Sequence, residues 1–528
     1  MVAAGLPGAT DDESDSIGGS SGSGSGNNAA GAAGSLRAGY TAAAAAAAGC
    51  SSSSSSASLL ASGGSKSSRG PAVGPDGVAG GSAGAPVGGA MFNLVKNIIG
   101  SGILALPAGV AAFSGARGAM VPAAAMTVAL GALSGYCFSL IGRACAATGA
   151  KTYGEAWSRT VGAGTAWLPS GSCTAKTFFA CLSYSIIIGD SFSDIARAFG
   201  APAWLAWRPA ALATVSGGAL LPLCLLKDLR PLSYTSLLGI VGTLYTAAVM
   251  TLRYFDGSYA PGGIYHGEMV AAAAAKLAAA GGGAAGVAGS AGVAAMASLA
   301  AGVPSFGGSA ALNPLALVLA STLSTAFIAH YNAPKFLAEL KPRGVAAFNK
   351  VVGASFGLSI ALFVAMTAFP FLTFGRACRG YILNNYSTAD GLATLCRLAI
   401  GLSILFGYPL TFITAREGVL AAAGAEKPSD RTVRLSTVGL LTLFTGVAVV
   451  LRDLGFVVSF GGAVLGSLII YVFPAAMWVA KCRKEIAAGA PPRGLRRAEY
   501  LANYGIVALG LVLGVLGAVV SVLKTFVW

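Results

Sequence analysis

The feature that most constrains this 528-residue chain is a series of apolar blocks, each long enough to cross a lipid bilayer. Only 10% of the residues are charged, whereas soluble domains carry roughly 25%, so the chain cannot cover a water-soluble fold with charge. We therefore predict an all-α integral membrane protein with eleven transmembrane helices. The predicted helices are 92–113, 119–142, 174–199, 208–226, 232–252, 312–334, 347–374, 391–415, 434–451, 455–480 and 502–527.

Two segments fall outside this pattern. Residues 1–90 consist almost entirely of Gly, Ser and Ala, and such a composition buries too little apolar surface to offset its ordering entropy. We predict a disordered tail for 1–90 and a transmembrane domain for 91–527. The Ala/Gly-rich stretch 255–311 predicts a flexible insertion in the loop between the fifth and sixth helices. The insertion divides the helices into five and five, with an eleventh left over.

The distribution of basic residues predicts the orientation. The net charge is +15, but the Lys and Arg residues form short clusters between apolar blocks and not the continuous basic face that nucleic acid requires. With a cytoplasmic N-terminus, 23 of the basic residues lie on the cytoplasmic side and nine on the opposite side, as the positive-inside rule expects. The N-glycosylation sequon Asn385-Tyr386-Ser387 then falls in an outer loop.

The sequence contains no convincing enzyme site. Its only histidines are His266 and His330, and no Ser/His/Asp set, metal-ligand cluster or phosphate-binding loop occurs among the apolar blocks. We therefore expect a protein that is not an enzyme and that has no cofactor.

The first apolar block contains a predicted break. Gly100-Ser101-Gly102 lies at mid-membrane, and Pro107 lacks the N–H needed to continue the helical hydrogen bonds. Irregular backbone at this depth is tolerated only where protein or a water-filled cavity satisfies it. A broken helix there offers N–H groups and a positive dipole end to an anionic group such as an amino acid carboxylate. The alternative is that the small residues form a close-packing face.

Residues 93–107 resemble the opening helix of the amino acid/auxin permease family. Four further stretches match this family in order: 181–190 its third helix, 221–228 its fourth-to-fifth corner, 326–339 its sixth helix and 397–416 its eighth. The resemblance covers about 91–527 and leaves out the tail and the insertion.

The resemblance implies a LeuT-type fold, with two inverted five-helix repeats, broken first and sixth helices and one extra helix. It also implies a substrate site at mid-membrane between the broken helices. The first helix would present backbone to the substrate carboxylate, the sixth would form the facing wall, and the third would add a hydroxyl. The implied substrate-binding residues are Ile99, Gly100, Ser101 and Gly102, then Ser324, Thr325 and Phe327, and finally Tyr184.

The coupling ion is less well defined. Sodium-coupled members of the family tend to carry a Thr hydroxyl within a turn before the proline of the eighth helix. Here the positions two and four residues before Pro409 are Gly407 and Leu405, which favours coupling to H⁺ over Na⁺. The candidate ion-coupling residues are Lys96, Asn97, His330, Ser403 and Thr411.

We therefore predict a monomeric secondary active transporter of neutral amino acids that works by alternating access in the plasma or vacuolar membrane. Three alternatives stay open: sodium coupling, an amine or auxin-like substrate, and a non-transporting amino acid sensor of the same fold that signals through the tail.

Overall fold

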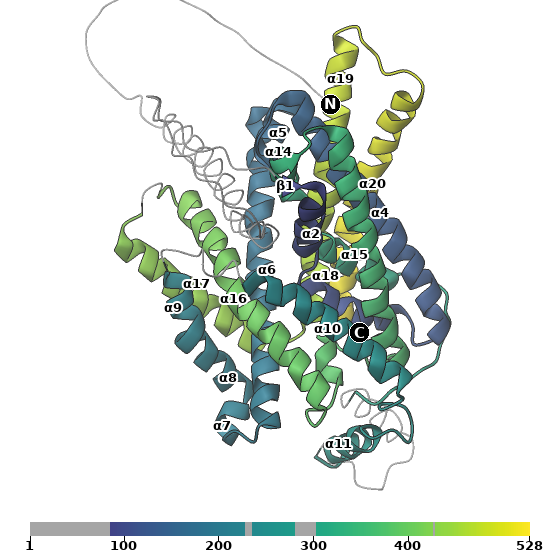
Figure 1. Ribbon diagram of the computed structural model, residues 1–528, viewed down its shortest axis with the longest axis vertical. Coiled ribbons are helices and arrows are strands. Elements are labelled where there is room, and N and C mark those ends of the chain that lie inside the picture. The colour runs from purple at the N-terminus through teal and green to yellow at the C-terminus, as the bar shows by residue number, and fades with distance from the viewer. Residues whose placement is uncertain (1–84, 227–234, 280–301, 426–427, 528) are drawn as a thin grey trace, which may run out of the picture.

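The computed structural model describes residues 85–226, 235–279, 302–425 and 428–527 (Figure 1). The predicted disordered tail lies outside these residues, except for its last six positions. Those positions form strand β1 (Ala85–Pro86) and the start of the first helix, and β1 pairs in parallel with β2 (Leu340–Lys341).

The other regular elements of the described residues are helices. The first half of the chain forms α2 (Val87–Ile98), η3 (Ser101–Ala105), α3 (Leu106–Phe113), η4 (Arg117–Ala119), α4 (Met120–Thr148), α5 (Tyr153–Thr160), η5 (Ala163–Thr165), α6 (Trp167–Ala198), α7 (Ala203–Ala206), α8 (Arg208–Val215), η6 (Ser216–Leu220), α9 (Leu221–Leu225), α10 (Thr235–Phe255) and α11 (His266–Ala279). The second half forms α13 (Ala316–Ala326), η8 (His330–Asn332), α14 (Ala333–Glu339), α15 (Val345–Phe374), η9 (Ile382–Asn385), α16 (Gly391–Ala422), α17 (Asp430–Val450), α18 (Leu454–Gly461), η10 (Gly462–Gly466), η11 (Leu468–Val472), α19 (Phe473–Ala487) and α20 (Leu495–Phe526).

In the described part of the chain, nine helices are long and apolar enough to cross a membrane, and a tenth span arises if α2 and η3–α3, bent by 47°, count as one. The all-helical membrane architecture agrees with the sequence analysis, but the sixth predicted helix, 312–334, is not continuous. Residues 312–334 instead contain α13, of eleven residues, followed after a non-helical gap by η8 and α14. The apolar composition of residues 312–334 predicts a membrane segment, but it does not show where the backbone leaves the helix.

Several helices extend beyond their apolar blocks. α6 begins at Trp167 and not at 174, α16 continues to Ala422, and α19 continues to Ala487. A helix can continue past the hydrocarbon layer, because polar side chains are tolerated there. The length of an apolar block therefore underestimates the length of the helix.

Residues 255–279 and 302–311 of the predicted insertion 255–311 lie within the described part of the chain. Its residues 266–279 form α11, and the backbone at its end is tied to the bundle. The N–H of Ser305 donates to the carbonyl of Phe374 over 3.1 Å, and the N–H of Gly307 donates to the carbonyl of Gly115 over 3.0 Å.

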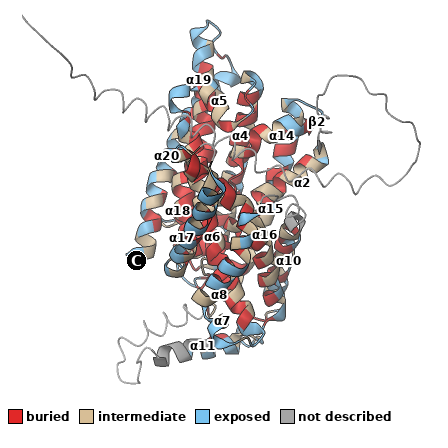
Figure 2. Cartoon of the chain, turned by 90° about the vertical axis from the view of Figure 1, so that its left-hand side faces the viewer, coloured by how far each residue is buried: buried red, intermediate tan, exposed pale blue. Residues whose placement is uncertain are grey.

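The buried centre of the bundle consists of α6, α13 and the α18–η10–η11 span, whereas α20 exposes most of its length (Figure 2). Glycines allow close helix approach: an added Cβ at Gly142 of α4 would come within 2.2 Å of the Phe348 ring of α15. Small residues at contacts are the usual means of packing helices in a membrane.

Candidate functional site

The first span is broken where the sequence predicts. Ile99 (ψ 101°) and Gly100 (φ −126°, ψ −172°) are extended, and the chain then continues as the 3₁₀-helix η3. The first N–H groups of a new helix have no partners within that helix. The break therefore leaves the first backbone N–H groups of η3, at Ser101 and Gly102, available to donate to a partner from outside the helix.

Gly102 lets the two discontinuous spans come together. A Cβ at this position would lie 3.1 Å from the Cα and 3.2 Å from the N of Ala326, the last residue of α13. These contacts are tighter than normal Cβ packing, so the close approach depends on the absence of a side chain at Gly102.

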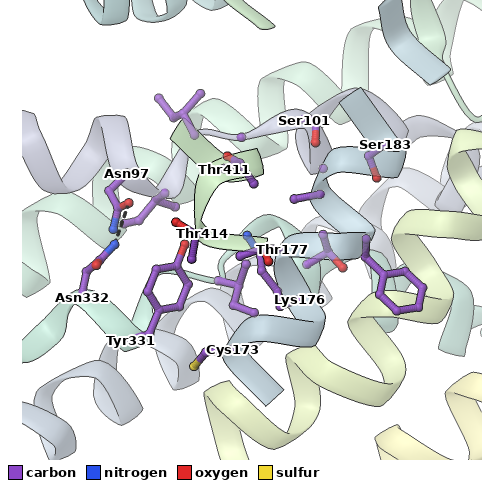
Figure 3. A pocket seen from close by; sticks show the side chains of 18 of the residues that line it. Asn97, Ser101, Cys173, Lys176, Thr177, Ser183, Tyr331, Asn332, Thr411 and Thr414 are labelled. Atoms are coloured by element: carbon purple, nitrogen blue, oxygen red, sulfur yellow. Dashed lines mark hydrogen bonds between the residues drawn. The ribbon is translucent and has the colours of Figure 1, made fainter. Parts of the chain in front are cut away.

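The second discontinuity lies directly opposite. α13 ends at Ala326, and α-helical structure resumes as α14 only at Ala333, after the 3₁₀-helix η8, with Pro334 in the first turn of α14. Asn332 of η8 donates its amide N–H to Oδ1 of Asn97 over 3.1 Å, which joins the two breaks (Figure 3). Thr325 donates its hydroxyl to the carbonyl of Val458 over 2.6 Å and so attaches α13 to α18.

A cavity of about 340 Å³ lies where these elements meet. Its size falls at the lower end of the range of small-molecule sites. Its walls come from both broken spans and from α6, α16 and α18. The polar lining side chains are Asn93, Lys96, Asn97, Ser101, Lys176, Thr177, Ser183, Tyr184, Thr325, Tyr331, Asn332, Lys335, Glu339, Thr411 and Thr414.

The charge in this cavity is predominantly positive. Lys96, Lys176 and Lys335 line it, and Glu339 is its sole carboxylate. Lys335 lies 3.8 Å from Glu339, measured from Nζ to Oε1. The Nζ of Lys176 lies 5.6 Å from the ring centroid of Tyr331, within the range of a cation–π contact. Figure 3 shows Lys176 and Tyr331 on opposite walls of the cavity.

The structure brings together most of the residues that the sequence singled out. Nine of the thirteen candidates line the cavity: Lys96, Asn97, Ile99, Gly100, Ser101, Gly102, Tyr184, Thr325 and Thr411. Ser324, Phe327, His330 and Ser403 are not among its lining residues.

Ser324 and Phe327 point into the protein packing. The Ser324 hydroxyl donates to the carbonyl of Ala320 over 3.0 Å, and the Phe327 ring lies 4.7 Å from that of Phe363, centroid to centroid. Successive helical residues are rotated by about 100°, and on α13 the cavity lies on the side of Thr325 and not on that of Ser324. Of the three residues expected to line the site from the sixth segment, only Thr325 does so.

His330 is fully buried away from the cavity. Its Nε2 lies 2.9 Å from the carbonyl oxygen of Ser134, and the Phe138 ring packs edge-on at 5.5 Å. These contacts connect η8 to α4.

A second, smaller cavity of about 160 Å³ lies on the other side of the first break, between the broken first span, α10 and α16. Ser403 and Thr243 line it, whereas Thr411 lines the larger cavity. Lys96 and Tyr184 line both cavities. In the described ranges, no group of three or more His, Cys, Asp and Glu residues is placed to hold a metal ion.

Sequence reasoning missed Lys176, Tyr331 and Asn332 as lining residues. The signal for Lys176 was available, because it lies inside the predicted helix 174–199, where a lysine needs a partner or a cavity. The orientation argument instead assigns it to a cytoplasmic loop. Tyr331 and Asn332 fall in the second break, which hydropathy does not reveal.

The sequence profile of the family described as "Transmembrane amino acid transporter protein" matches residues 84–523, which includes both breaks and every wall of the cavity. The chain belongs to this family. It is therefore an integral, multi-pass membrane protein of an amino acid transporter family.

Individual relatives are similar at lower identity. The bovine (Bos taurus) protein named "Putative sodium-coupled neutral amino acid transporter 11" is 23% identical over 393 residues, which cover 74% of this chain and 75% of the relative. The mouse (Mus musculus) "Sodium-coupled neutral amino acid transporter 7" is 26% identical over 409 residues, covering 73% and 77%. Its human (Homo sapiens) counterpart is also 26% identical, over 407 residues.

Proposed function

We propose that the protein is a secondary active transporter that moves neutral amino acids across a membrane by alternating access, coupled to protons. The observation that carries this proposal is the cavity at the meeting point of two discontinuous spans, with the extended backbone of Ile99 and Gly100 in its wall. The names of the relatives support a neutral amino acid as the substrate.

The cavity offers partners for both ends of such a substrate. The N–H groups at the start of η3, at Ser101 and Gly102, suit the α-carboxylate, because a helix N-terminus attracts negative charge. The positive lining charge of Lys96 and Lys176 acts in the same direction. Tyr184 and Thr325 supply hydroxyls from the facing walls.

The positions of the two breaks also favour the LeuT-type arrangement of two inverted five-helix repeats followed by an eleventh helix. The first break lies in the opening span, and the second lies in the segment 312–334 that opens the second group of five. We further propose a monomer with a cytoplasmic N-terminus, in the plasma or vacuolar membrane.

Lys96 supports coupling to protons. Its side chain lines the small cavity together with Ser403, one of the two hydroxyls that could hold Na⁺. Among the described residues no carboxylate forms an ion pair with Lys96, so its charge is not neutralised by an ion pair. A positive charge disfavours Na⁺ in the same small space, whereas an intramembrane lysine that lines two cavities can exchange a proton.

Sodium coupling is the second candidate, and the names of the relatives favour it. Uptake of a labelled amino acid mixture into proteoliposomes, under a pH gradient and then a Na⁺ gradient, separates the two. We expect accumulation with the pH gradient alone and loss of this dependence in Lys96→Gln. Accumulation that requires Na⁺ would contradict proton coupling and would make Na⁺ the coupling ion, bound at Ser403 or Thr411.

The same preparation tests the sensor alternative. A transporter lacking residues 1–84 should retain its uptake, since the described lining residues of the cavity all lie between Asn93 and Leu465. Folded protein that binds amino acids yet accumulates none under either gradient would contradict transport.

A further inference from the structure

The turn between α19 and α20 carries the densest group of cations in the described part of the chain. Residues 481–499 contain two acids, Glu485 and Glu499, and six basic residues: Lys481, Arg483, Lys484, Arg493, Arg496 and Arg497. This hairpin end stands out from the bundle in Figure 1, and Figure 2 shows it as largely exposed.

The two acids are already engaged. Glu499 accepts two hydrogen bonds from Arg143 of α4, at 2.5 and 2.9 Å. Glu485 accepts from Lys481 over 2.6 Å and from Arg496 over 3.0 Å.

The remaining four cations have no carboxylate partner among the described residues. Arg483 donates to the Tyr504 hydroxyl over 3.0 Å, and Lys484 donates to the carbonyl of Arg159 over 2.9 Å, so both keep their full charge. Arg493 and Arg497 are exposed and take part in none of the ion pairs found at this end. The hairpin therefore presents at least four uncompensated positive charges.

The surrounding side chains place these charges at the surface of a membrane. Below the turn, α20 exposes an apolar face that includes Leu509, Val515 and Val519, as expected for a helix in contact with lipid. Tyr500 and Tyr504 lie between this face and the turn, and Tyr is enriched at the headgroup level.

Leu495 lies within the basic cluster and is 91% exposed, and Leu501 is 58% exposed one turn and a half further along α20. An apolar side chain beside arginines is unfavourable in water but suits an interface with acyl chains on one side and phosphates on the other.

We propose that the hairpin end, defined by Arg483, Lys484, Arg493 and Arg497, binds the headgroups of anionic phospholipids in the bilayer that holds the protein. A cluster of four to eight basic residues next to a membrane helix has the chemistry for this interaction, and arginine forms bidentate hydrogen bonds with phosphate. The positive-inside rule would by itself explain basic residues in this loop. It does not explain why exposed leucines lie among them.

The test uses the full chain in phosphatidylcholine proteoliposomes that contain a trace of spin-labelled lipid. Electron paramagnetic resonance measures the fraction of labelled lipid whose motion the protein restricts. We expect labelled phosphatidylserine to associate about threefold more strongly than labelled phosphatidylcholine. This preference should disappear in 1 M NaCl, where the screening length is about 3 Å.

Arg483→Gln/Arg493→Gln/Arg497→Gln should abolish the preference, and the charge-conserving triple replacement by Lys should retain most of it. The matched control, Lys341→Gln/Arg343→Gln/Lys350→Gln, removes three exposed charges next to the β1–β2 pair and should leave the preference intact.

Three results would overturn the proposal: no phosphatidylserine preference in the unmodified chain, an equal loss in the matched control, or displacement of the lipid by 10 mM inorganic phosphate, which would make the site one for soluble anions. The measurement does not depend on transport, so its outcome is independent of that of the uptake experiment.

Discussion

Gly102 is the residue on which the meeting of the two broken spans depends. A leucine at this position would place its Cβ within 3.1 Å of the Ala326 backbone, which cannot rotate away as a side chain could. Overpacking of this kind costs about 1–3 kcal/mol, and we expect Gly102→Leu to reduce amino acid uptake at least about tenfold. Gly439→Leu is the matched control, because a Cβ at Gly439 meets nothing within 4 Å. Equal uptake by the two variants would contradict the role assigned to Gly102.

The side chain of Asn385, the acceptor of the N-glycosylation sequon, is inaccessible in the three-dimensional structure. Its side chain is buried: Nδ2 donates to the carbonyl of Ala377 over 2.7 Å, and Oδ1 accepts from the N–H of Arg379 over 2.9 Å. A glycan on Nδ2 is incompatible with both bonds, so we expect the transport-competent protein to carry none. Glycosidase treatment should leave the electrophoretic mobility of the active fraction unchanged, and Asn385→Ala should lower stability by about 1–3 kcal/mol. A glycan at Asn385 on active protein would show that this loop adopts another structure.

At single positions, the sequence predicted backbone features better than side-chain directions. The Gly-Ser-Gly string and Pro107 sufficed to predict the break, because backbone propensity is local. Ser324 and Phe327 were assigned to the site wall, yet they face the packing, because one residue along a helix changes the direction by about 100°. The sequence alone does not define the phase of α13 relative to the cavity.

At the scale of elements, an ion pair joins the end of α10 to the start of α16. Arg253 donates to both carboxylate oxygens of Asp390, at 2.7 and 2.9 Å, and Tyr259 donates a third hydrogen bond over 3.0 Å. Asp390 is fully buried and also caps the N-terminus of α16 through the N–H of Leu392.

Removal of one partner of such a buried pair leaves the other charge uncompensated. Asp390→Ala should therefore lower the free energy of unfolding by about 3–5 kcal/mol, with a corresponding fall in the apparent Tm of the detergent-solubilised protein. Asp256→Ala removes the more exposed carboxylate that contacts the same Arg253 and should cost at most about 1 kcal/mol. Similar Tm values for the two variants would mean that the pair does not hold α10 and α16 together.

The positions of helices were predictable, whereas their continuity was not. Apolar blocks mark the membrane interior, and each predicted block corresponds to helical structure in the described residues. The division of residues 312–334 into α13 and α14 is set by contacts from other elements, such as those of Asn332 with Asn97 and of Thr325 with Val458. A single-sequence pattern contains no record of those partners.

At the scale of the whole molecule, the two ends of the bundle differ in access. The cavity at the breaks extends to Lys335 and Glu339 of α14, at the end that carries the β1–β2 pair. A separate cavity of about 460 Å³ opens at the opposite end, near α7 and α11, and the two share no lining residue. In the lining of this second cavity, Asp190 forms an ion pair with Arg208 and accepts a 2.8 Å hydrogen bond from Asn384. Each of the two cavities therefore belongs to its own end of the bundle.

This asymmetry predicts opposite chemical accessibility at the two ends. The eight cysteines within the described residues are buried, but Cys173 lines the cavity at the breaks, so a Cys50→Ser/Cys173→Ala background should react little with a membrane-impermeant maleimide. We expect Lys335→Cys to be labelled from the side of the N-terminus, and Ser387→Cys, in the second cavity, from the other side. A transported amino acid should slow labelling of Lys335→Cys about threefold or more and leave Ser387→Cys unaffected, because the substrate fills only the cavity at the breaks. Labelling of both from the same side would contradict a pathway that runs from one end to the other, and protection of both would place the substrate in a cavity that spans the bundle.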